Sequence, residues 1–298
     1  MFERMNPPFS YYGGKQRMVS KLIPLIPKHT VYAEPFGGSG GLLFAKPWPK
    51  VTNTHHYREI WNDKNELVYN FFHQLRINGE KLCEQIALTP HSESEHKIAK
   101  NFDCDDLEKA RRFFVNINQS FSNTLNAGWR RGVFGCNLGM DWSNKINLKP
   151  YLERIMPITF SCTDATKFID QFDSPQTFFY VDPPYPGAHQ GHYAGYSQED
   201  FDQLVDKLKN IEGSFLLSCY GDKRCDQMFE RFNFDAVCSS KMVNYDRTKK
   251  IDQSDQNRKR VEVVYRKFSI ETRDEIKKLY ASGAFDCFVK HPWEVVKN

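Results

Sequence analysis

The sequence predicts an α/β protein with a mostly parallel sheet, helices on both faces and a mostly helical insertion. Short apolar segments alternate with stretches of helical periodicity, which is typical of parallel sheets. A glycine cluster follows the first apolar segment, as in sheets that bind ligands at their carboxyl edge. The alternation stops between about residues 71 and 155, where helical and polar sequence takes over. We therefore expect a main domain formed by residues 1–70 and 156–298, and an inserted domain formed by residues 71–155.

The first half of the chain supplies two predicted strands. Residues 31–34 are apolar and run into the glycine cluster, after which residues 41–46 continue as a predicted helix. Residues 57–61 read as the second strand, and residues 65–77 have helical periodicity. Within the insertion, residues 107–121 have the pattern of a long helix.

The alternation resumes after the insertion. Three further strands are predicted, at residues 158–162, 177–181 and 214–218. Helices are predicted between them, at residues 166–172 and 198–210. We expect the chain to close with two antiparallel strands and a helix, at residues 234–243, 260–268 and 271–282.

Composition indicates a packed protein of the reducing cytoplasm. Of 298 residues, 40% are hydrophobic, and the net charge of +4 permits nucleic-acid binding without requiring it. The N-terminal segment has no apolar run typical of a signal peptide, and no segment approaches the length of a membrane span. The eight cysteines form no C-x-x-C pair, so we expect reduced thiols and no zinc site.

The glycine loop, "EPFGGSGG" at residues 34–41, lies between the first strand and the first helix. Glycines allow the backbone to approach a ligand closely and to point N–H groups at it. A glycine cluster alone is equally compatible with a tight turn. Its position after the first strand favours a ligand-binding role.

Two acids follow the next strands. Asp63 comes after the second strand, where related sheets place an acid that binds a ribose hydroxyl, and Asp164 comes after the third. Aspartate also favours the N-cap position of a helix. Capping is therefore the alternative role for both residues.

The acceptor loop, "DPPY" at residues 182–185, ends a strand of five apolar residues. Asp182 supplies a hydrogen-bond acceptor. Pro183 and Pro184 stiffen the backbone and remove N–H donors, and Tyr185 supplies an aromatic face. A rigid turn is the alternative interpretation. Rigid acceptors beside an aromatic ring suit a planar base that carries an amino group.

Four motifs in order give the chain a resemblance to a known family. They are "YYGGK" (11–15), "EPFGGSGG" (34–41), "NDKNELVYNFF" (62–72) and "VDPPY" (181–185), with a long insertion before the last. Together they resemble the Dam-like, alpha-group DNA adenine methyltransferases over residues 8–267. The segment "FFVNINQSFSNTLNAGW" (113–129) is similar to the target-recognition region of that family.

The resemblance implies a Rossmann-like sheet that binds S-adenosylmethionine. The glycine loop would lie along the methionine part, Asp63 would hold the ribose and Asp164 would lie near the adenine ring of the cofactor. Tyr11 and Lys15 match an N-terminal motif that contacts the cofactor. The implied cofactor site comprises Tyr11, Lys15, Glu34, Pro35, Phe36, Gly37, Gly38, Gly40, Asp63, Asp164 and Asp182.

The resemblance also implies methyl transfer to the N6 amino group of adenine in double-stranded DNA, by direct displacement. The Asp182 carboxylate and the Pro183 carbonyl would accept the two amino protons. Tyr185 would stack on a base flipped out of the duplex. RNA adenine, or another amino acceptor, is the alternative substrate. A silent DNA-binding module is a further alternative, but it would tolerate loss of Asp182 or the glycine loop.

Residues 71–155 would then read the DNA target. The expected DNA contacts in this insertion are Arg111, Arg112, Asn118, Ser120, Asn123, Arg130 and Arg131. Solvated surface arginines, caps and turns are the alternatives. Residues 241–267 carry nine Lys or Arg against four acids, so we expect Lys249, Lys250 and Arg258 to follow the phosphate backbone.

The remaining expectations concern partners and location. His189 and His192 lack accompanying acids or cysteines, so we expect no metal there but a loop that orders over the flipped base. The resemblance implies a monomer, in the cytoplasm of a bacterium or a phage-infected cell. A cognate restriction endonuclease is compatible with the family, and the sequence leaves the recognised DNA site open.

Overall fold

The fold of this chain is given by a computed structural model. It describes residues 5–11, 14–16, 18–48, 57–132, 137–186, 195–234 and 262–267. In this part of the chain no helix is long and apolar enough to cross a membrane. The predicted C-terminal helix at residues 271–282 lies outside it.

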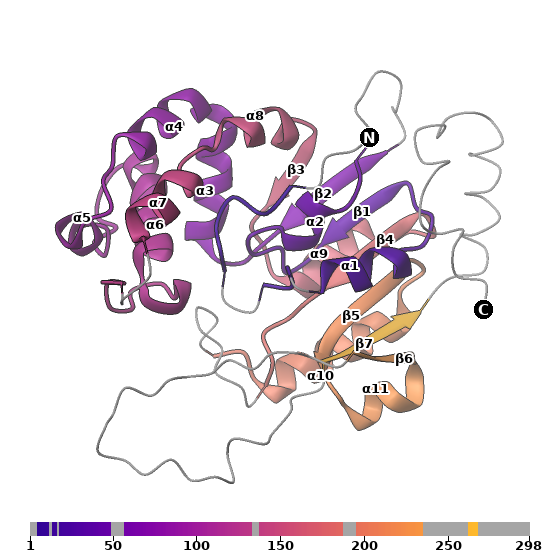
Figure 1. Ribbon diagram of the computed structural model, residues 1–298. Coiled ribbons are helices and arrows are strands. Elements are labelled where there is room, and N and C mark those ends of the chain that lie inside the picture. The colour runs from indigo at the N-terminus through magenta and orange to yellow at the C-terminus, as the bar shows by residue number, and fades with distance from the viewer. Residues whose placement is uncertain are drawn as a thin grey trace, which may run out of the picture.

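A seven-stranded sheet forms the centre of the molecule, in the order β3-β2-β1-β4-β5-β7-β6 (Figure 1). The strands are β1 (Val31–Glu34), β2 (Arg58–Asn62), β3 (Ile158–Ser161), β4 (Thr177–Val181), β5 (Ser214–Tyr220), β6 (Glu230–Phe234) and β7 (Glu262–Lys267). The first five pair in parallel, and β7 runs antiparallel to both β5 and β6. The predicted mixed α/β fold with a mostly parallel sheet is confirmed.

The strand order reverses between β1 and β4. From β1 the chain continues outward to β2 and β3, and then returns so that β4 pairs with the other side of β1. Ligands of open α/β sheets bind at such a switch point, outside the carboxyl ends of the strands. The glycine loop follows β1 and the acceptor loop follows β4, so both predicted motifs lie at the switch point.

Both faces of the sheet are buried, because alternate strand residues enter two different hydrophobic clusters. Tyr32, Trp61 and Phe178 join one cluster, whereas Ala33 and Phe179 join the other. Strands covered on both faces are continuously apolar. This burial explains the uninterrupted run "TFFYV" of β4, all of which is buried.

The second face, which carries Ala33 and Phe179, is covered by three helices. These are α9 (Ala165–Phe172), α10 (Gln198–Asn210) and α11 (Lys223–Met228). α10 begins with a capping box in which Ser197 and Asp200 bond each other's backbone N–H groups. It buries Phe201, Leu204, Val205 and Leu208 at helical spacing.

The first face is covered by N-terminal helices and by the segment between β2 and β3. Its regular elements are α1 (Val19–Leu22), η1 (Ile23–Leu25), α2 (Gly41–Ala45), α3 (Glu66–Ile77), α4 (Gly79–Ala87), α5 (Glu93–Ile98), α6 (Asp106–Gln119), η2 (Phe121–Asn123), α7 (Leu138–Lys145) and α8 (Lys149–Ile155). Helices α4 to α8 gather to the left of the sheet in Figure 1.

This helical segment shares its core with the sheet. Phe71 and Phe72 of α3 lie 5.1 and 5.8 Å, between ring centroids, from Phe9 near the N-terminus. Phe9 also meets Phe113 of α6 at 5.2 Å. The hydrophobic cluster is therefore continuous across residue 71, and the division into domains 1–70 with 156–298 and 71–155 stays a prediction.

Element boundaries agree with the sequence expectations except near the C-terminal strands. β6 ends at Phe234, where the first strand of the antiparallel pair was expected to begin. Helix α11 was not predicted, because its six residues "KRCDQM" have too short a pattern to identify. Its clearest sequence signal is Asp222, whose carboxylate accepts from the N–H groups of Arg224 and Cys225.

Candidate active site

The glycine loop is held against β2 by close backbone packing. The N–H of Gly37 donates to the carbonyl of Asn62 at 2.7 Å. A Cβ on Gly37 would lie 2.0 Å from Nε1 of the buried Trp61, so no larger residue fits there without displacing the indole. Gly38 and Gly40 have positive φ angles of 49° and 73°, which favour glycine. The loop is therefore a specific structure rather than a loose turn.

Asn62 ties together the ends of three neighbouring strands. Its Nδ2 donates to the carbonyls of Pro35 and Thr163, at 2.9 and 3.1 Å, and its Oδ1 accepts from the N–H of Thr163 at 3.0 Å. These bonds connect the glycine loop, the end of β2 and the turn after β3. Asn62 was not among the predicted site residues. Its position at the end of a predicted strand, directly before Asp63, could have indicated a role at the site.

Asp63 supports the glycine loop directly. It is 1% exposed, and its two carboxylate oxygens accept from the N–H groups of Gly38 and Asn65, both at 2.8 Å. The N-cap of α3 is Asn65, whose side chain accepts from the N–H of Leu67. The capping alternative considered for Asp63 therefore belongs to Asn65. A ribose contact by Asp63 stays a prediction.

Asp164 is the N-cap of α9. Its Oδ1 accepts from the N–H and the hydroxyl of Thr166, at 3.0 and 2.7 Å. Its Oδ2 lies 3.6 Å from the ammonium of Lys64, and 42% of its side chain is exposed. The capping role is therefore present, and a cofactor contact from the exposed side stays a prediction.

Glu34 faces the interior. It is 1% exposed and accepts a hydrogen bond from the hydroxyl of Tyr32 at 2.5 Å. Burial raises the pKa of Glu34 to about 8, although Tyr32 and Lys46 act in the opposite direction. Its carboxyl group lies among side chains behind the glycine loop, and its predicted contact with the cofactor stays untested.

The acceptor loop places a carboxylate in a largely enclosed setting. The side chain of Asp182 is 17% exposed, and its Oδ1 lies 2.8 Å from Nζ of Lys15. The hydroxyl of Tyr185 donates to the same oxygen at 3.2 Å. Burial raises the pKa of Asp182, and Lys15 and Tyr185 work against that rise. The structure thus brings together Lys15, Asp182 and Tyr185, which are separated by up to 170 positions in the sequence.

Aromatic rings surround the two loops. The Tyr185 ring meets Tyr220, at the end of β5, edge to face with 4.6 Å between centroids. Phe36 of the glycine loop meets Tyr196 at 6.0 Å. The hydroxyl of Tyr11 accepts from Nδ2 of Asn65 at 3.3 Å. The carboxyl edge of the sheet therefore presents acceptor oxygens among flat apolar faces, a setting that suits a planar polar ligand.

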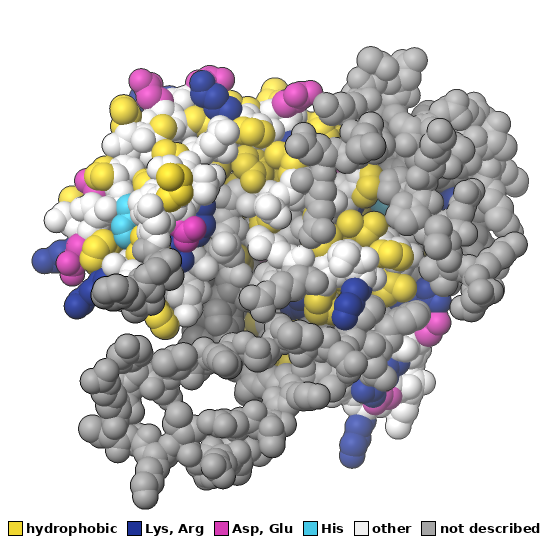
Figure 2. All heavy atoms as spheres, viewed as in Figure 1, with side chains coloured by type: hydrophobic (Ala, Val, Ile, Leu, Met, Phe, Trp, Pro, Cys, Tyr) yellow, Lys and Arg dark blue, Asp and Glu magenta, His cyan; other side chains and the backbone are white. Residues whose placement is uncertain are grey.

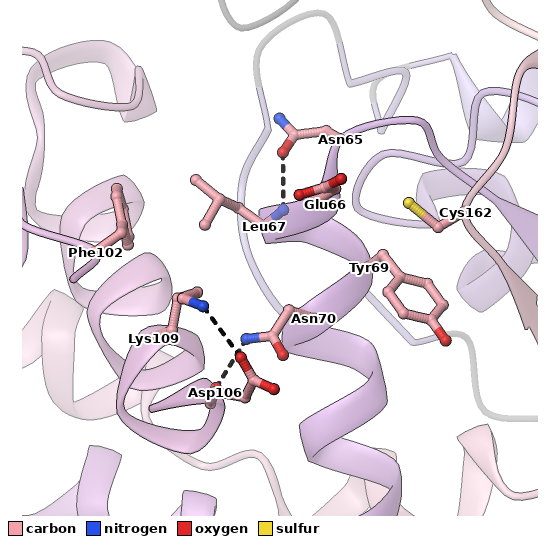
Figure 3. Close-up of a pocket in the computed structure, with 9 residues that line it drawn as sticks. All are labelled: Asn65, Glu66, Leu67, Tyr69, Asn70, Phe102, Asp106, Lys109 and Cys162. Carbon is pink, nitrogen blue, oxygen red and sulfur yellow. Dashed lines mark hydrogen bonds and ion pairs between the residues drawn. The ribbon is translucent and has the colours of Figure 1, made fainter. Parts of the chain in front are cut away.

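A surface pocket of about 630 Å³ lies beside this edge, between the N-terminal ends of α3 and α6 (Figure 3). It is lined by Asn65, Glu66, Leu67, Tyr69, Asn70, Phe102, Asp106, Lys109 and Cys162. One lining residue, Asn65, donates its N–H to Asp63, which in turn holds the glycine loop. The pocket includes no residue of the glycine loop or of the acceptor loop. Residues 65–67, 69 and 70 of the motif at 62–72 contribute to this pocket, whereas the glycine loop and the acceptor loop lie at the switch point.

The predicted DNA contacts on α6 and at its C-cap, Ser120, are engaged within the protein. Arg111 and Arg112 both pair with Glu108, with N–O distances of 2.7 Å. Asn118 is 1% exposed, and its Nδ2 donates to the carbonyl of Phe114. The hydroxyl of Ser120 lies 2.8 Å from Nε2 of the buried His96. Contacts from these residues to DNA stay a prediction.

The loop after α6 presents the remaining predicted contacts. Asn123 has a left-handed φ of 50°, and its neighbour Phe121 is 64% exposed. Arg130 pairs with Asp141 at 2.9 Å, and Arg131 is exposed. Figure 2 shows acidic and basic side chains interspersed on the described helices of this face. The predicted contacts and loop residues beyond this part of the chain, Lys249, Lys250, Arg258, His189 and His192, lie outside the described residues.

Within the described part of the chain, no group of three His, Cys, Asp or Glu side chains is placed to hold a metal ion. The five cysteines described there are free.

Comparison with known proteins identifies the family. The family described as D12 class N6 adenine-specific DNA methyltransferase matches residues 11–279, which include all four motifs and both loops of the switch point. Comparison with curated proteins gave no match. The match covers most of the 298 residues. The chain therefore belongs to the D12 class of N6 adenine-specific DNA methyltransferases.

Proposed function

We propose that this enzyme transfers a methyl group from S-adenosylmethionine to N6 of an adenine flipped out of double-stranded DNA. Methylation of adenine in DNA follows from the family; the donor, the flipping and the residue roles are the proposal. The observation that carries it is the acceptor loop at the switch point, where Asp182 is enclosed beside Tyr185 and follows β4, the neighbour of the strand that leads into the glycine loop.

The residues at the switch point fit S-adenosylmethionine in chemical kind. When bound, this group supplies an electrophilic methyl on a sulfonium. The glycine loop brings backbone close to the site because Gly37 and Gly40 exclude side chains at those positions. Phe36 and Tyr11 offer rings, and Asp63 and Asp164 lie after adjacent strands. The cofactor would be held by these residues, with Asp63 also fixing the loop through Gly38.

Asp182 and Pro183 orient the amino group. The nitrogen of an adenine amino group is a poor nucleophile, because its lone pair is delocalised into the ring. Hydrogen bonds from its two protons to the Asp182 carboxylate and the Pro183 carbonyl draw the nitrogen toward tetrahedral geometry. They also stabilise the positive charge that develops on it. Holding the reacting groups in line contributes several kcal/mol, about 7 or more in favourable cases.

Tyr185 supplies the stacking face for the base. Its ring is fixed at one side by Tyr220 and by its own hydrogen bond to Asp182. Stacking of a base on an aromatic ring contributes about 1–3 kcal/mol. The amino group cannot reach an enclosed carboxylate from inside a duplex, so the adenine must be flipped. The mechanism requires no covalent enzyme intermediate.

The segment between β2 and β3 is proposed to bind the duplex around the target. The loop after α6 supports this role, because Ser122, Asn123 and Asn126 hold left-handed backbone conformations and such strain is concentrated at functional sites. The half-buried Arg130 and the exposed Arg131 lie on the same loop. We propose that the enzyme acts as a monomer.

Labelled methyl transfer from S-adenosylmethionine tests the proposal. The purified protein is incubated with unmethylated genomic DNA and, separately, with unstructured and duplex RNA of matched composition. Transfer to DNA, with cofactor binding in calorimetry, is the expected result. Transfer confined to RNA would mean that RNA, and not DNA, is the substrate. Absence of cofactor binding would contradict the proposal as a whole.

A further inference from the structure

Lys15 is held in place by a compact turn before α1. The N–H of Gly14 donates to the carbonyl of Tyr11 at 3.0 Å, and a Cβ on Gly14 would lie 3.0 Å from that oxygen. The carbonyl of Lys15 accepts from the N–H groups of Met18 and Val19 at 2.8 and 3.1 Å, which starts the helix. These bonds of Gly14 and Lys15 fix the backbone from which the lysine side chain extends.

The ammonium of Lys15 reaches the acceptor loop. Its Nζ lies 2.8 Å from Oδ1 of Asp182 and 4.8 Å from the centroid of the Tyr185 ring. Only 10% of the lysine side chain is exposed. The family resemblance implied a cofactor contact for this residue. The geometry instead connects it to the two side chains proposed to hold the adenine.

The two oxygens of Asp182 have different surroundings. Oδ1 is contacted by Lys15 and by the hydroxyl of Tyr185. Oδ2 has no hydrogen-bond partner among the residues that the structure describes. An acid in an enclosed setting tends to bind a proton unless a positive charge lies close. A protonated carboxyl would offer a donor where the amino group needs an acceptor.

We propose that Lys15 is a positioning residue for methyl transfer, which clamps Oδ1 of Asp182 so that Oδ2 remains an ionised acceptor for the adenine amino group. This inference rests on the proposed function, because it assigns the substrate proton to Oδ2. It predicts that the charge of Lys15, more than its length, maintains activity at neutral pH.

Few ionisable groups act on this carboxyl. In the described part of the chain they are Lys15, from the turn before α1, and Tyr185, from the acceptor loop itself. β5 contributes Tyr220, which packs on Tyr185 and not on the carboxylate. The glycine loop contributes Phe36, which does not ionise, and Glu34, which is buried beside Tyr32 and does not act on this carboxyl. Removing the lysine charge should therefore raise the pKa of Asp182, and the acid limb of the activity profile should follow.

The test compares Lys15→Met and Lys15→Arg with wild type, with Lys21→Met, at an exposed position of α1, as the control. Single-turnover methylation of unmethylated duplex DNA is followed from pH 5 to pH 9. Cofactor affinity is measured by calorimetry. The carboxyl of Asp182 is also titrated by carbon NMR in the DNA-free protein, with Asp182→Asn to assign its resonance.

The expected result is a shift of the acid limb by about 1–3 pH units upward in Lys15→Met, with an equal shift in the NMR titration. Lys15→Arg and Lys21→Met should keep the wild-type profile. Unchanged titration in Lys15→Met would overturn the inference. A loss of cofactor affinity large enough to explain the lost rate would also overturn it. So would tighter DNA binding with an unchanged pH profile, because Lys15 would then only compete with the adenine for its place beside Asp182.

Two outcomes separate this inference from the proposed function. If wild type transfers no methyl group to DNA, the proposed function fails while the NMR titration still decides whether Lys15 controls Asp182. If Lys15→Met does not fold, the conservative Lys15→Gln and the titration of wild-type Asp182 replace it. A wild-type Asp182 that binds its proton above neutral pH in the presence of Lys15 would overturn the inference directly.

Discussion

Replacing Arg154 with methionine should destabilise the fold strongly, because its guanidinium is part of a buried ion cluster. Arg154 of α8 is 1% exposed and contacts both carboxylate oxygens of Glu59 on β2, at 2.6 and 3.0 Å. Its Nη2 also donates to the carbonyl of Leu43 in α2 at 2.9 Å. The ammonium of Lys46 contacts Oε1 of the same carboxylate. The cluster thus joins the last helix of the β2–β3 segment to the sheet.

The expected size follows from what Arg154→Met leaves behind. Removing one partner of a buried ion pair costs about 3–5 kcal/mol, and an unsatisfied buried carbonyl adds about 1–3 kcal/mol. Because Lys46 still neutralises Glu59, we expect the loss to lie near the lower end, at about 3 kcal/mol. Burial acts to raise the pKa of Glu59, but Lys46 and Arg154 outweigh it and the pKa is lowered. The stability contributed by Glu59 is therefore lost as pH falls through its lowered folded pKa.

Equilibrium urea unfolding at pH 7 measures this loss. Lys207→Met is the matched control, because Lys207 pairs with Asp170 at 2.6 Å on the surface, where the two side chains are 33% and 60% exposed. Surface pairs contribute little, so the control should change the free energy of unfolding by less than about 0.5 kcal/mol. A loss below about 1 kcal/mol in Arg154→Met, or equal losses in both variants, would refute the reasoning.

Three further perturbations test the glycine loop, the buried acid and the stacking ring. Gly37→Ala should lower the free energy of unfolding in urea by about 1–3 kcal/mol and weaken cofactor binding, because the new Cβ would meet Trp61 at 2.0 Å. The control Gly41→Ala should be nearly neutral, because its Cβ would meet nothing nearer than 4.0 Å. Equal effects of the two substitutions would contradict the packing explanation. Burial raises the pKa of Glu34 from 4.5 to about 8, so ionisation of Glu34 increasingly opposes folding as pH rises between these values. The urea midpoint of Glu34→Gln, relative to that of wild type, should therefore increase from pH 5 to pH 8.5. A difference in midpoint that does not change with pH would contradict the raised pKa. Tyr185→Ala should weaken base flipping about 5- to 150-fold, read from 2-aminopurine fluorescence at the target, and an unchanged signal would remove the stacking role.

The central parts of the fold were predictable because they depend on local patterns. The buried residues of β4 form one uninterrupted stretch of sequence, and so does the glycine loop after β1. Because strands and helices alternate along the chain, the loops that follow these strands must meet at the carboxyl edge of the parallel sheet. The shared core of α3, α6 and Phe9 was not predictable, because aromatic contacts such as Phe9–Phe113 join residues about a hundred positions apart. For the same reason the boundary at residue 71 does not coincide with a gap in packing.

The candidate site was predictable in its motifs and not in its contacts. Asp182 and Tyr185 were identified from "DPPY" itself, whereas Asn62 acts through bonds to Pro35 and Thr163 that no spacing rule indicates. Lys15 was matched to a cofactor motif, and its contact with Asp182 required the fold. Among the predicted DNA contacts, Arg111 illustrates the limit most clearly. Its partner Glu108 lies three positions earlier on the same helix, which the spacing could indicate, whereas Glu95 lies on α5 and becomes a neighbour only in the folded structure.

Nucleoside analysis of methylated DNA tests the central claim most directly. Unmethylated genomic DNA is incubated with S-adenosylmethionine and either wild type or Asp182→Ala, then digested to nucleosides and quantified by mass spectrometry. The account predicts N6-methyladenine with wild type and none above background with Asp182→Ala, at a cofactor concentration that saturates both proteins. N6-methyladenine at comparable levels with Asp182→Ala, or methylation confined to cytosine, would contradict the role assigned to the acceptor loop.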